Sequence, residues 1–401
     1  TYFAAVAEKW PENALAEPAL YWSAEELFKA EDWENAAKAY AAVPAKFPAG
    51  KYAAPSLYSL GWSEFQRGRF EAAATSFKDF LAKFPAHELA PECRVKLGEA
   101  LTKLKKHDEA LAAYSQAKTA AGKIGQEAAI GAAWCLYEQG KFAEAATAFG
   151  QAAARIGKDP RAATCVFNAG NAHVENKDYP KAAVEFAKLP AEFPDHELAA
   201  DAAYWHGYCL VRMGKFDEAA VVLEKLKASG KAGKKEAEAL HSLAEAKFGQ
   251  KNYKDAAALY ADVAKRFPKH RLAASAAYGR MLAIEKTGDL AEAETAGNEF
   301  FPAFADSDTA PLARFALGEC RFRLKKYPEA ADDFRKFLAG TGAADLAADA
   351  EYKLGWCELN LKNPAGALAR FSNVVAKYPK SPLAPEAAYL AGRAAEAGGD
   401  K

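Results

Sequence analysis

One alanine recurs along the chain at nearly constant spacing, and this spacing constrains the fold more than any other feature of the sequence. Successive copies are 37 residues apart, except for one step of 35. Four residues after the alanine, nine of ten copies carry a large side chain, and twelve residues before it nine of ten carry a small one. The ten alanines are Ala36, Ala73, Ala110, Ala145, Ala182, Ala219, Ala256, Ala293, Ala330 and Ala367.

This pattern predicts two helices in each repeat. A small residue on a first helix lets a second helix approach closely. We expect the alanine of the second helix to pack against it, and the large side chain one turn later to fill the space toward the next repeat. One such pair cannot bury its own apolar face, so the pairs are expected to stack into a solenoid. Abundant helix-forming residues and sparse β-branched residues favour an all-α chain.

The order of small residue and then aromatic-x-x-Ala-x-x-x-aromatic resembles the tetratricopeptide repeat over essentially the whole chain. The resemblance implies an all-α, right-handed α-α superhelical solenoid of about ten helix pairs. Several repeats end in aromatic-Pro, then His or Ser, then Leu, as in FPDHELAADAAYWHGYCL at 193–210. We interpret the His or Ser as a cap for the next helix. These junctions are similar to a bacterial cell-envelope subgroup that includes the Tol-Pal accessory protein and the lipoprotein of the β-barrel assembly machinery.

The repeat register predicts how the chain is organised. Residues 1–15 are expected to be the second helix of a preceding repeat, and 381–401 the first helix of a following one, so we expect a piece of a longer repeat protein. Repeats 1–3 span 16–117, repeats 4–6 span 118–228, and repeats 7–10 span 229–380.

Departures from the register predict irregular places. Three junctions, at 118–126, 227–235 and 339–345, are glycine-rich and lack the aromatic-Pro ending. Repeat eight carries Met281, Leu290 and Gly297 at signature positions. Glycine lowers the cost of non-helical backbone, so these places either bend or form irregular but rigid connections.

Composition and motifs exclude several function classes. The 53 basic and 53 acidic residues cancel, so no charge excess indicates nucleic acid or an anionic membrane, and no apolar run is long enough to span a bilayer. The six cysteines share two repeat positions, which indicates buried free thiols. No histidine or cysteine spacing fits a metal, and no P-loop or G-x-S-x-G motif occurs. We expect no enzyme, cofactor or metal.

The first helices carry aromatic residues three before, one after and four after the small residue, about one turn apart on one face. The resemblance implies that this face lines a concave groove, where Tyr and Trp beside charges suit peptide binding. For any single tyrosine, core packing explains the position equally well, whereas the tryptophans favour the groove. The predicted groove residues are Tyr58, Trp62, Phe65, Trp134, Tyr137, Tyr204, Tyr208, Arg212, Phe322, Arg323, Tyr352 and Trp356.

The sequence therefore favours a non-enzymatic scaffold that binds peptide segments or partner subunits along this groove. The alternative is an architectural spacer that self-assembles into a homo-oligomer through its terminal repeats. The junctions favour a bacterial periplasm or cell envelope, whereas six unpaired cysteines favour a reducing cytoplasm.

Overall fold

The structure is a computed structural model that describes residues 2–340 and 344–399. In these ranges it consists of α-helices and two short 3-10 helices, without strands, which confirms the all-α class and the stacked helix pairs. The chain divides into two compact units, Thr1–Ala202 and Ala203–Lys401, with the division inside α12 (Ala199–Arg212).

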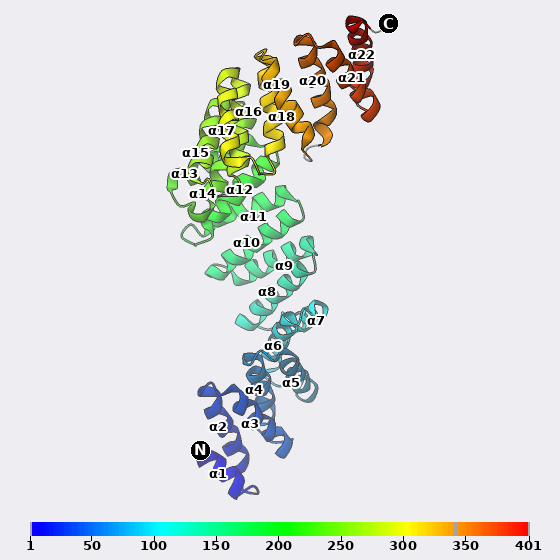
Figure 1. The fold of residues 1–401 in the computed structure, drawn as a ribbon. Coiled ribbons are helices and arrows are strands. Elements are labelled where there is room, and N and C mark those ends of the chain that lie inside the picture. Colours follow the sequence, from blue (N-terminus) through cyan, green and yellow to red (C-terminus); the bar gives the residue numbers. More distant parts are fainter. Residues whose placement is uncertain (1, 341–343, 400–401) are drawn as a thin grey trace. The chain divides into compact units, whose positions relative to one another are not determined.

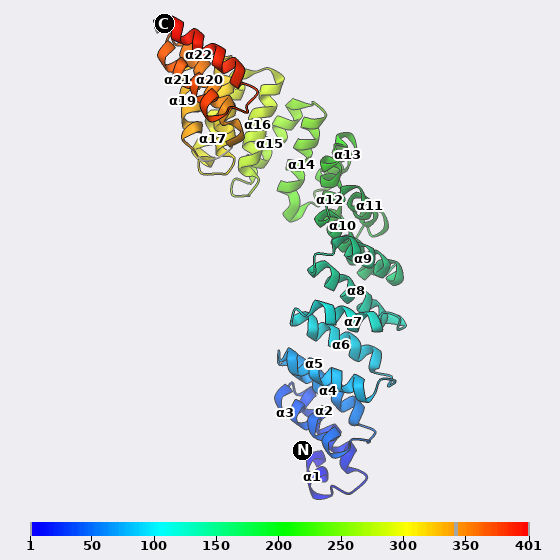
Figure 2. The same ribbon diagram turned by 90° about the vertical axis from the view of Figure 1, so that its right-hand side faces the viewer.

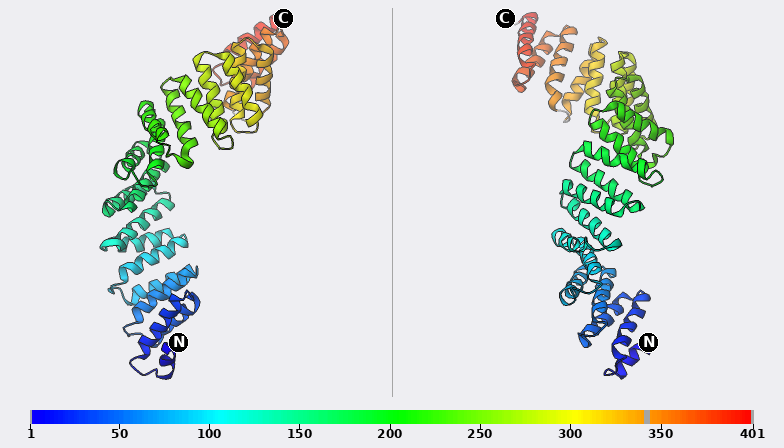
Figure 3. Two further views of the ribbon diagram at one scale, coloured as in Figure 1. Left: turned by 90° about the vertical axis from the view of Figure 1, so that its left-hand side faces the viewer. Right: turned by 180° about the vertical axis from the view of Figure 1, so that it is seen from behind.

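In the first unit, the helices before α12 each pack against their neighbours along the chain, as the blue-to-green helices of Figure 1 and the left panel of Figure 3 show. Its helices before α12 are α1 (Tyr2–Lys9), α2 (Ala16–Lys29), α3 (Trp33–Lys46), α4 (Ala53–Gln66), α5 (Phe70–Lys83), α6 (Ala90–Lys103), α7 (His107–Ala117), α8 (Gly122–Glu138), α9 (Phe142–Ile156), α10 (Pro160–Glu175) and α11 (Tyr179–Glu192).

The second unit repeats this arrangement, and Figure 2 shows α14, α15 and α16 following one another in the stack. The even-numbered helices from α2 to α20 are called first helices. Each one and the helix after it make up one repeat, and the repeats are numbered one to ten along the chain. After α12 come α13 (Phe216–Ser229), η1 (Gly233–Lys235), α14 (Glu236–Gly249), α15 (Tyr253–Arg266), α16 (Ala273–Thr287), α17 (Leu290–Phe304), α18 (Ala310–Arg323), α19 (Tyr327–Ala339), η2 (Ala344–Leu346), α20 (Ala347–Asn360), α21 (Pro364–Lys377) and α22 (Ala384–Gly398).

The repeat signature is the packing contact inside each pair. All ten signature alanines have 0% exposure. We expected the small residue to contact the alanine, but its close neighbour is the large side chain one turn after the alanine. A Cβ added to Gly61 would lie 2.6 Å from the Phe77 ring, and one added to Gly318 would lie 2.9 Å from the Phe334 ring. The ring also reaches the next repeat, since a Cβ on Gly131 would lie 2.5 Å from the Tyr114 ring.

Every pair turns through a residue with positive φ, seven residues after the small position. In repeat one, the Asp32 N–H donates to the Leu27 carbonyl, which is the bond that closes a Schellman motif, and Glu31 takes a φ of 58°. Asp32 then caps α3 by accepting from the Asn35 N–H. The left-handed residues of the other nine turns are Gly68, Lys105, Gly140, Lys177, Gly214, Lys251, Gly288, Lys325 and Lys362.

The predicted caps at the junctions are confirmed. His87, His196 and His270 each accept the N–H of the residue two positions later through Nδ1, at 3.1, 3.1 and 3.2 Å. Ser381 does the same through Oγ, at 3.2 Å. Each bond satisfies a donor at the start of a first helix, so these imidazoles have a structural role.

The glycine-rich junctions are tied down in different ways. The Arg155 guanidinium donates to the carbonyls of Lys118 and Ala120, which anchors the first junction to α9. The second contains η1, with left-handed Gly230 and Gly233. Of the third, residues 341–343 lie outside the described part of the chain.

Repeat eight reverses the sizes of the contacting residues. Met281 stands at the small position of α16 and is 2% exposed, while Gly297 stands at the large position of α17. A Cβ on Gly297 would lie 2.9 Å from Met281 Sδ and 2.8 Å from Leu317 Cδ1. The methionine therefore fills from the first helix the space that a large side chain of the second helix fills in the other repeats.

Candidate partner-binding surface

The twelve predicted groove residues lie on the first helices α4, α8, α12, α18 and α20. We call the positions three before, one after, four after and five after the small residue the first-helix face. The structure brings these residues together in local clusters, because each cluster combines one helix with the first helix of a neighbouring repeat. First helices of successive repeats touch at α4–α6, α6–α8 and α16–α18.

In the first unit, Trp62 stacks on Phe65 with their ring centroids 5.3 Å apart. Lys96, from α6, places its Nζ 4.4 Å from the centre of the Trp62 ring. The same Nζ lies 3.0 Å from the carboxylate of Glu99. One cation thus lies between an aromatic ring and an acid.

Two repeats further along, Trp134 is 38% exposed, and its ring is in edge contact with Phe149 and with Tyr137. Glu138 and Glu175 are both exposed. Burial, together with the negative charges of Glu175 and Glu138, raises the pKa of the Tyr137 phenol. Aromatic surface and negative charge therefore meet on α8 and α10.

In the second unit, the Arg212 guanidinium lies 5.2 Å from the centre of the Tyr208 ring and 2.6 Å from the Glu245 carboxylate. Burial opposes ionisation of Glu245, but His241 and Arg212 hold its pKa below the ordinary value. His241 Nε2 is 3.3 Å from Ser275 Oγ, and its Nδ1 is 3.7 Å from Glu245. The second distance is too long for the hydrogen bond that a hydrolytic triad needs.

A third cation is Lys353 of α20, whose Nζ lies 5.4 Å from the centre of the Phe322 ring and 2.9 Å from Glu319. Arg323 is exposed and forms an ion pair with a glutamate of α16. Trp356 is half-buried against the second helix of its own repeat, α21.

Three predicted tyrosines serve mainly as packing. Tyr204 and Tyr352 are only 5% and 8% exposed, so for these two the prediction of an accessible groove side chain is wrong. Tyr352 lies against Phe371 at 5.8 Å. Tyr58 donates its hydroxyl to Glu92 at 2.8 Å and so ties α4 to α6. Position alone could not separate these tyrosines from exposed ones, because neighbouring first helices cover this position to different depths.

Sequence reasoning found Arg212 but missed the other two cations of these clusters. Lys96 and Lys353 stand two residues before the small residue of the following first helix, a position not considered for the groove. Comparing that position across repeats would have revealed two lysines facing the aromatic positions of the preceding repeat. The prediction treated each first helix separately and did not consider that side chains of consecutive first helices contact one another.

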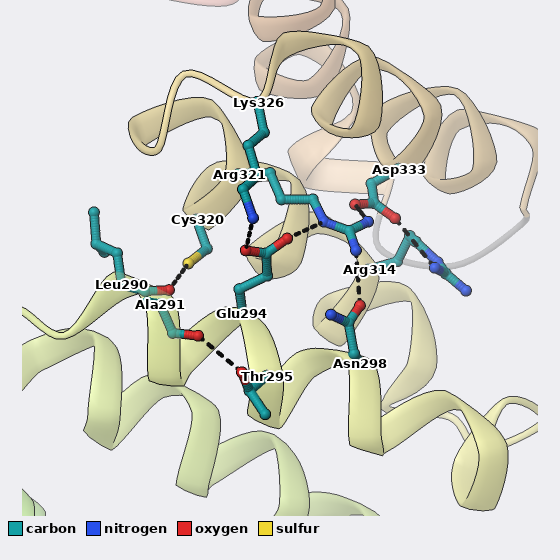
Figure 4. Close-up of polar contacts among 10 residues, drawn as sticks. All are labelled: Leu290, Ala291, Glu294, Thr295, Asn298, Arg314, Cys320, Arg321, Lys326 and Asp333. Carbon is teal, nitrogen blue, oxygen red and sulfur yellow. Dashed lines mark hydrogen bonds and ion pairs between the residues drawn. The ribbon is translucent and has the colours of Figure 1, made fainter.

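A polar network joins repeats eight and nine, as Figure 4 shows. Asp333 of α19 has a side chain 1% exposed and accepts from Arg321 at 2.6 Å and from Arg314 at 3.1 Å. Arg321 continues to Glu294 at 3.2 Å and to Asn298 at 2.7 Å, both on α17. The network therefore crosslinks three helices through buried charge.

The two carboxylates of this network titrate differently. Burial raises the pKa of Asp333 against the opposing effect of the two arginines. Burial has the same tendency at Glu294, but hydrogen bonds and charges from Lys326 and Arg321 hold the pKa of Glu294 below its ordinary value. The side chains are saturated by one another, so we assign the network to packing between repeats.

The six cysteines are buried free thiols, as predicted. Burial raises the pKa of Cys93 to about 12 and of Cys165 to about 11, so neither forms the thiolate that a nucleophile requires. Within residues 2–340 and 344–399, no group of three His, Cys, Asp or Glu side chains could hold a metal ion. In the same ranges no helix has the length and apolarity that crossing a membrane demands.

Two family models match the chain. The tetratricopeptide repeat model matches residues 58–123 and 130–197, and the outer membrane lipoprotein model matches residues 198–397. No curated protein sequence matches.

Several solved structures are similar to parts of the chain. A tetratricopeptide repeat protein from Parabacteroides merdae has 16% identity and a TM-score of 0.35, covering 76% of this chain and 98% of its own. YrrB, described as a TPR protein with an unusual peptide-binding site, has 17% identity and a TM-score of 0.40, with coverages of 51% and 97%. PilF of Pseudomonas aeruginosa has 14% identity and a TM-score of 0.43, with coverages of 56% and 95%.

Proposed function

We propose, from the premise that this chain is a tetratricopeptide repeat protein whose residues 198–397 match the outer membrane lipoprotein family, that it is a protein-interaction scaffold. Its binding surface is the first-helix face, where it holds peptide segments or partner subunits. The scaffold acts by binding alone, without a catalytic site of its own.

One contrast between the two kinds of helix supports this proposal. The large signature side chains of the second helices are buried, and Phe77 and Phe334 have 0% exposure. Trp62, Trp134 and Trp356 of the first helices instead keep part of their rings in contact with solvent. Tryptophan is enriched at the interface positions that contribute most of the binding energy.

The cell envelope is the compartment that we propose. The match of residues 198–397 to the outer membrane lipoprotein family supports it. Fractionation of the source organism, with immunodetection of the chain, tests this. Recovery in the cytoplasmic fraction alone would contradict it.

Site-specific photo-crosslinking tests the surface itself. A benzophenone side chain placed at Trp134 is expected to capture a partner, whereas one placed at the exposed Val184 of the second helix α11 is not. The triple variant Trp62→Ala, Trp134→Ala, Trp356→Ala should recover at least about tenfold less of that partner, since each interface tryptophan contributes about 1–2 kcal/mol or more.

A matched control replaces three exposed valines of second helices, Val184→Ala, Val221→Ala and Val375→Ala. It should recover the partner as the unaltered chain does. Equal recovery by the tryptophan variant and this control would contradict the first-helix face and favour an architectural role. Circular dichroism of both variants checks that the helices remain folded.

A further inference from the structure

Three first-helix clusters already hold a basic side chain between an aromatic ring and a carboxylate. The cations are Lys96, Arg212 and Lys353. Their distances to the ring centres are 4.4, 5.2 and 5.4 Å, and their distances to the carboxylates are 3.0, 2.6 and 2.9 Å. The face therefore has a recurrent chemistry that stabilises an organic cation.

Trp134 occupies the same position in its repeat as Trp62, but it lacks such a cation. The position that supplies Lys96 to Trp62 is Asn168 in the repeat after Trp134. Among residues 2–340 and 344–399, no Lys or Arg lies over the Trp134 ring. In keeping with this, Trp134 has an exposure of 38%.

The carboxylates at this place are also without a basic partner. Glu138 lies one helical turn after Trp134 on α8, and Glu175 projects from α10. Both are exposed, and in the described part of the chain neither forms an ion pair. Both charges act on Tyr137, whose ring centre is 5.5 Å from that of Trp134. We call these four residues the Trp134 surface.

We propose that the Trp134 surface binds a basic side chain of the partner peptide, arginine in preference to lysine; this rests on the proposed scaffold function. A planar guanidinium can stack on the indole and donate hydrogen bonds to carboxylates at its edge. The surface thereby receives from the partner what Lys96 supplies to Trp62 from inside the chain. Charge complementarity selects a basic segment over an acidic or purely apolar one.

The test uses two pentapeptides, acetyl-Ala-Ala-Arg-Ala-Ala-amide and its counterpart with citrulline, which has the shape of arginine without its charge. Each is titrated into the full chain labelled with ¹⁵N-tryptophan, and the indole N–H signal of Trp134 is followed, assigned by Trp134→Phe. The arginine peptide should shift this signal saturably and bind about fivefold or more tightly than the citrulline peptide.

Two variants separate charge from shape. Glu138→Gln with Glu175→Gln should weaken the arginine peptide about fivefold, whereas the control Glu71→Gln with Glu144→Gln, on second helices, should not change it. Asn168→Lys leaves the ring and both carboxylates in place but supplies an internal cation, so it should weaken binding to a similar extent.

The outcomes distinguish this proposal from the scaffold function. Equal binding of the two peptides, no response of Trp134 to either, or unchanged binding in Asn168→Lys would each overturn the basic-residue proposal. Partner capture at Trp134 in the crosslinking experiment would then still support the scaffold. Absence of capture at Trp134 would overturn the scaffold function and this proposal together.

Discussion

Repeats eight and nine are neighbours in the second unit that place their large residue on opposite helices. In α16–α17 the first helix contributes Met281 and the second contributes Gly297, whereas in α18–α19 the first contributes Gly318 and the second Phe334. Both pairs bury the large member, at 2% and 0% exposure. The contact thus requires one large and one small residue, and either helix can supply the large one.

The two repeats also differ in how they are held from outside. His270 caps the helix that opens repeat eight, whereas the equivalent Ser307 donates its hydroxyl to the Phe304 carbonyl at 2.8 Å. Repeat nine instead has the Asp333 network, which binds it to repeat eight. Repeat nine thus lacks the helix cap of repeat eight but has the Asp333 network. The following variants test how much the cap and the network each contribute to stability.

The largest effect is expected for Phe334→Ala, which removes the large member of the repeat-nine contact. Truncating a fully buried phenylalanine costs about 4 kcal/mol, because transfer free energy and a cavity are both lost. Hydrogen exchange of the α18 and α19 amides measures this locally. The control Phe301→Ala, at a half-buried ring, should cost clearly less; equal protection losses would contradict the comparison.

A reversal of sizes tests repeat eight. Met281→Gly should cost about 3.5 kcal/mol, from lost burial and helix propensity, and Gly297→Phe alone about 2 kcal/mol or more from overpacking. Together they recreate the arrangement of repeat nine, so the double variant should be more stable than the sum of the single losses predicts. Additive losses in urea unfolding would show that the two residues do not share one space.

Asp333→Asn should cost about 3 kcal/mol, because it leaves two arginines beside a buried neutral group. The adjacent Asp332→Asn is a matched control, since its carboxylate is 53% exposed and forms a surface ion pair with Lys336. That change should remain within about 0.5 kcal/mol. If both variants unfolded at the same urea concentration, the network would contribute nothing to the joint between repeats.

Glu294→Gln should cost about 1 kcal/mol near neutral pH. The pKa of Glu294 is lowered in the folded state, so its contribution is complete above the ordinary glutamate pKa of about 4.3 and is lost as pH falls through the lowered value. The difference in stability between the variant and the parent, measured by unfolding, should therefore be larger at pH 7 than at pH 3. A constant difference would contradict an ionic role.

The smallest effect concerns the caps. His270→Ala should cost about 0.7 kcal/mol, within the range for losing an N-terminal cap, and Ser307→Ala less than about 0.3 kcal/mol because its hydroxyl caps no helix start. Exchange rates at the first amides of α16 and α18 measure both. A larger loss at Ser307 would reverse this part of the comparison.

The fold could be predicted because the same physical requirement recurs ten times. Each signature alanine must sit where a helix crosses closely, so its column in the sequence reports burial directly. The packing of repeat eight could not be predicted in this way, because a comparison of single positions treats Met281 and Gly297 as two unrelated exceptions to the pattern. Only their contact in space makes them one compensated pair.

The candidate surface was less predictable for a related reason. The aromatic positions follow from helical periodicity, but exposure depends on how far the next first helix covers them. Tyr352 is buried while Trp134 is open, although both positions belong to the same face. Lys96 and Lys353 act across repeats, so a register read one repeat at a time does not show them.

The shared turn inside the helix pairs has a consequence for engineering. Six of the ten turns hold a left-handed Glu or Lys where four hold glycine. A non-glycine residue in this conformation costs about 1–2 kcal/mol. Replacing it with glycine removes this strain, but glycine loses more conformational entropy on folding, so the net gain in stability is smaller than the strain. The six positions belong to separate repeats, so gains at each should add. Replacing these six residues with glycine should therefore raise the thermal stability of the chain without altering any residue of the partner-binding surface.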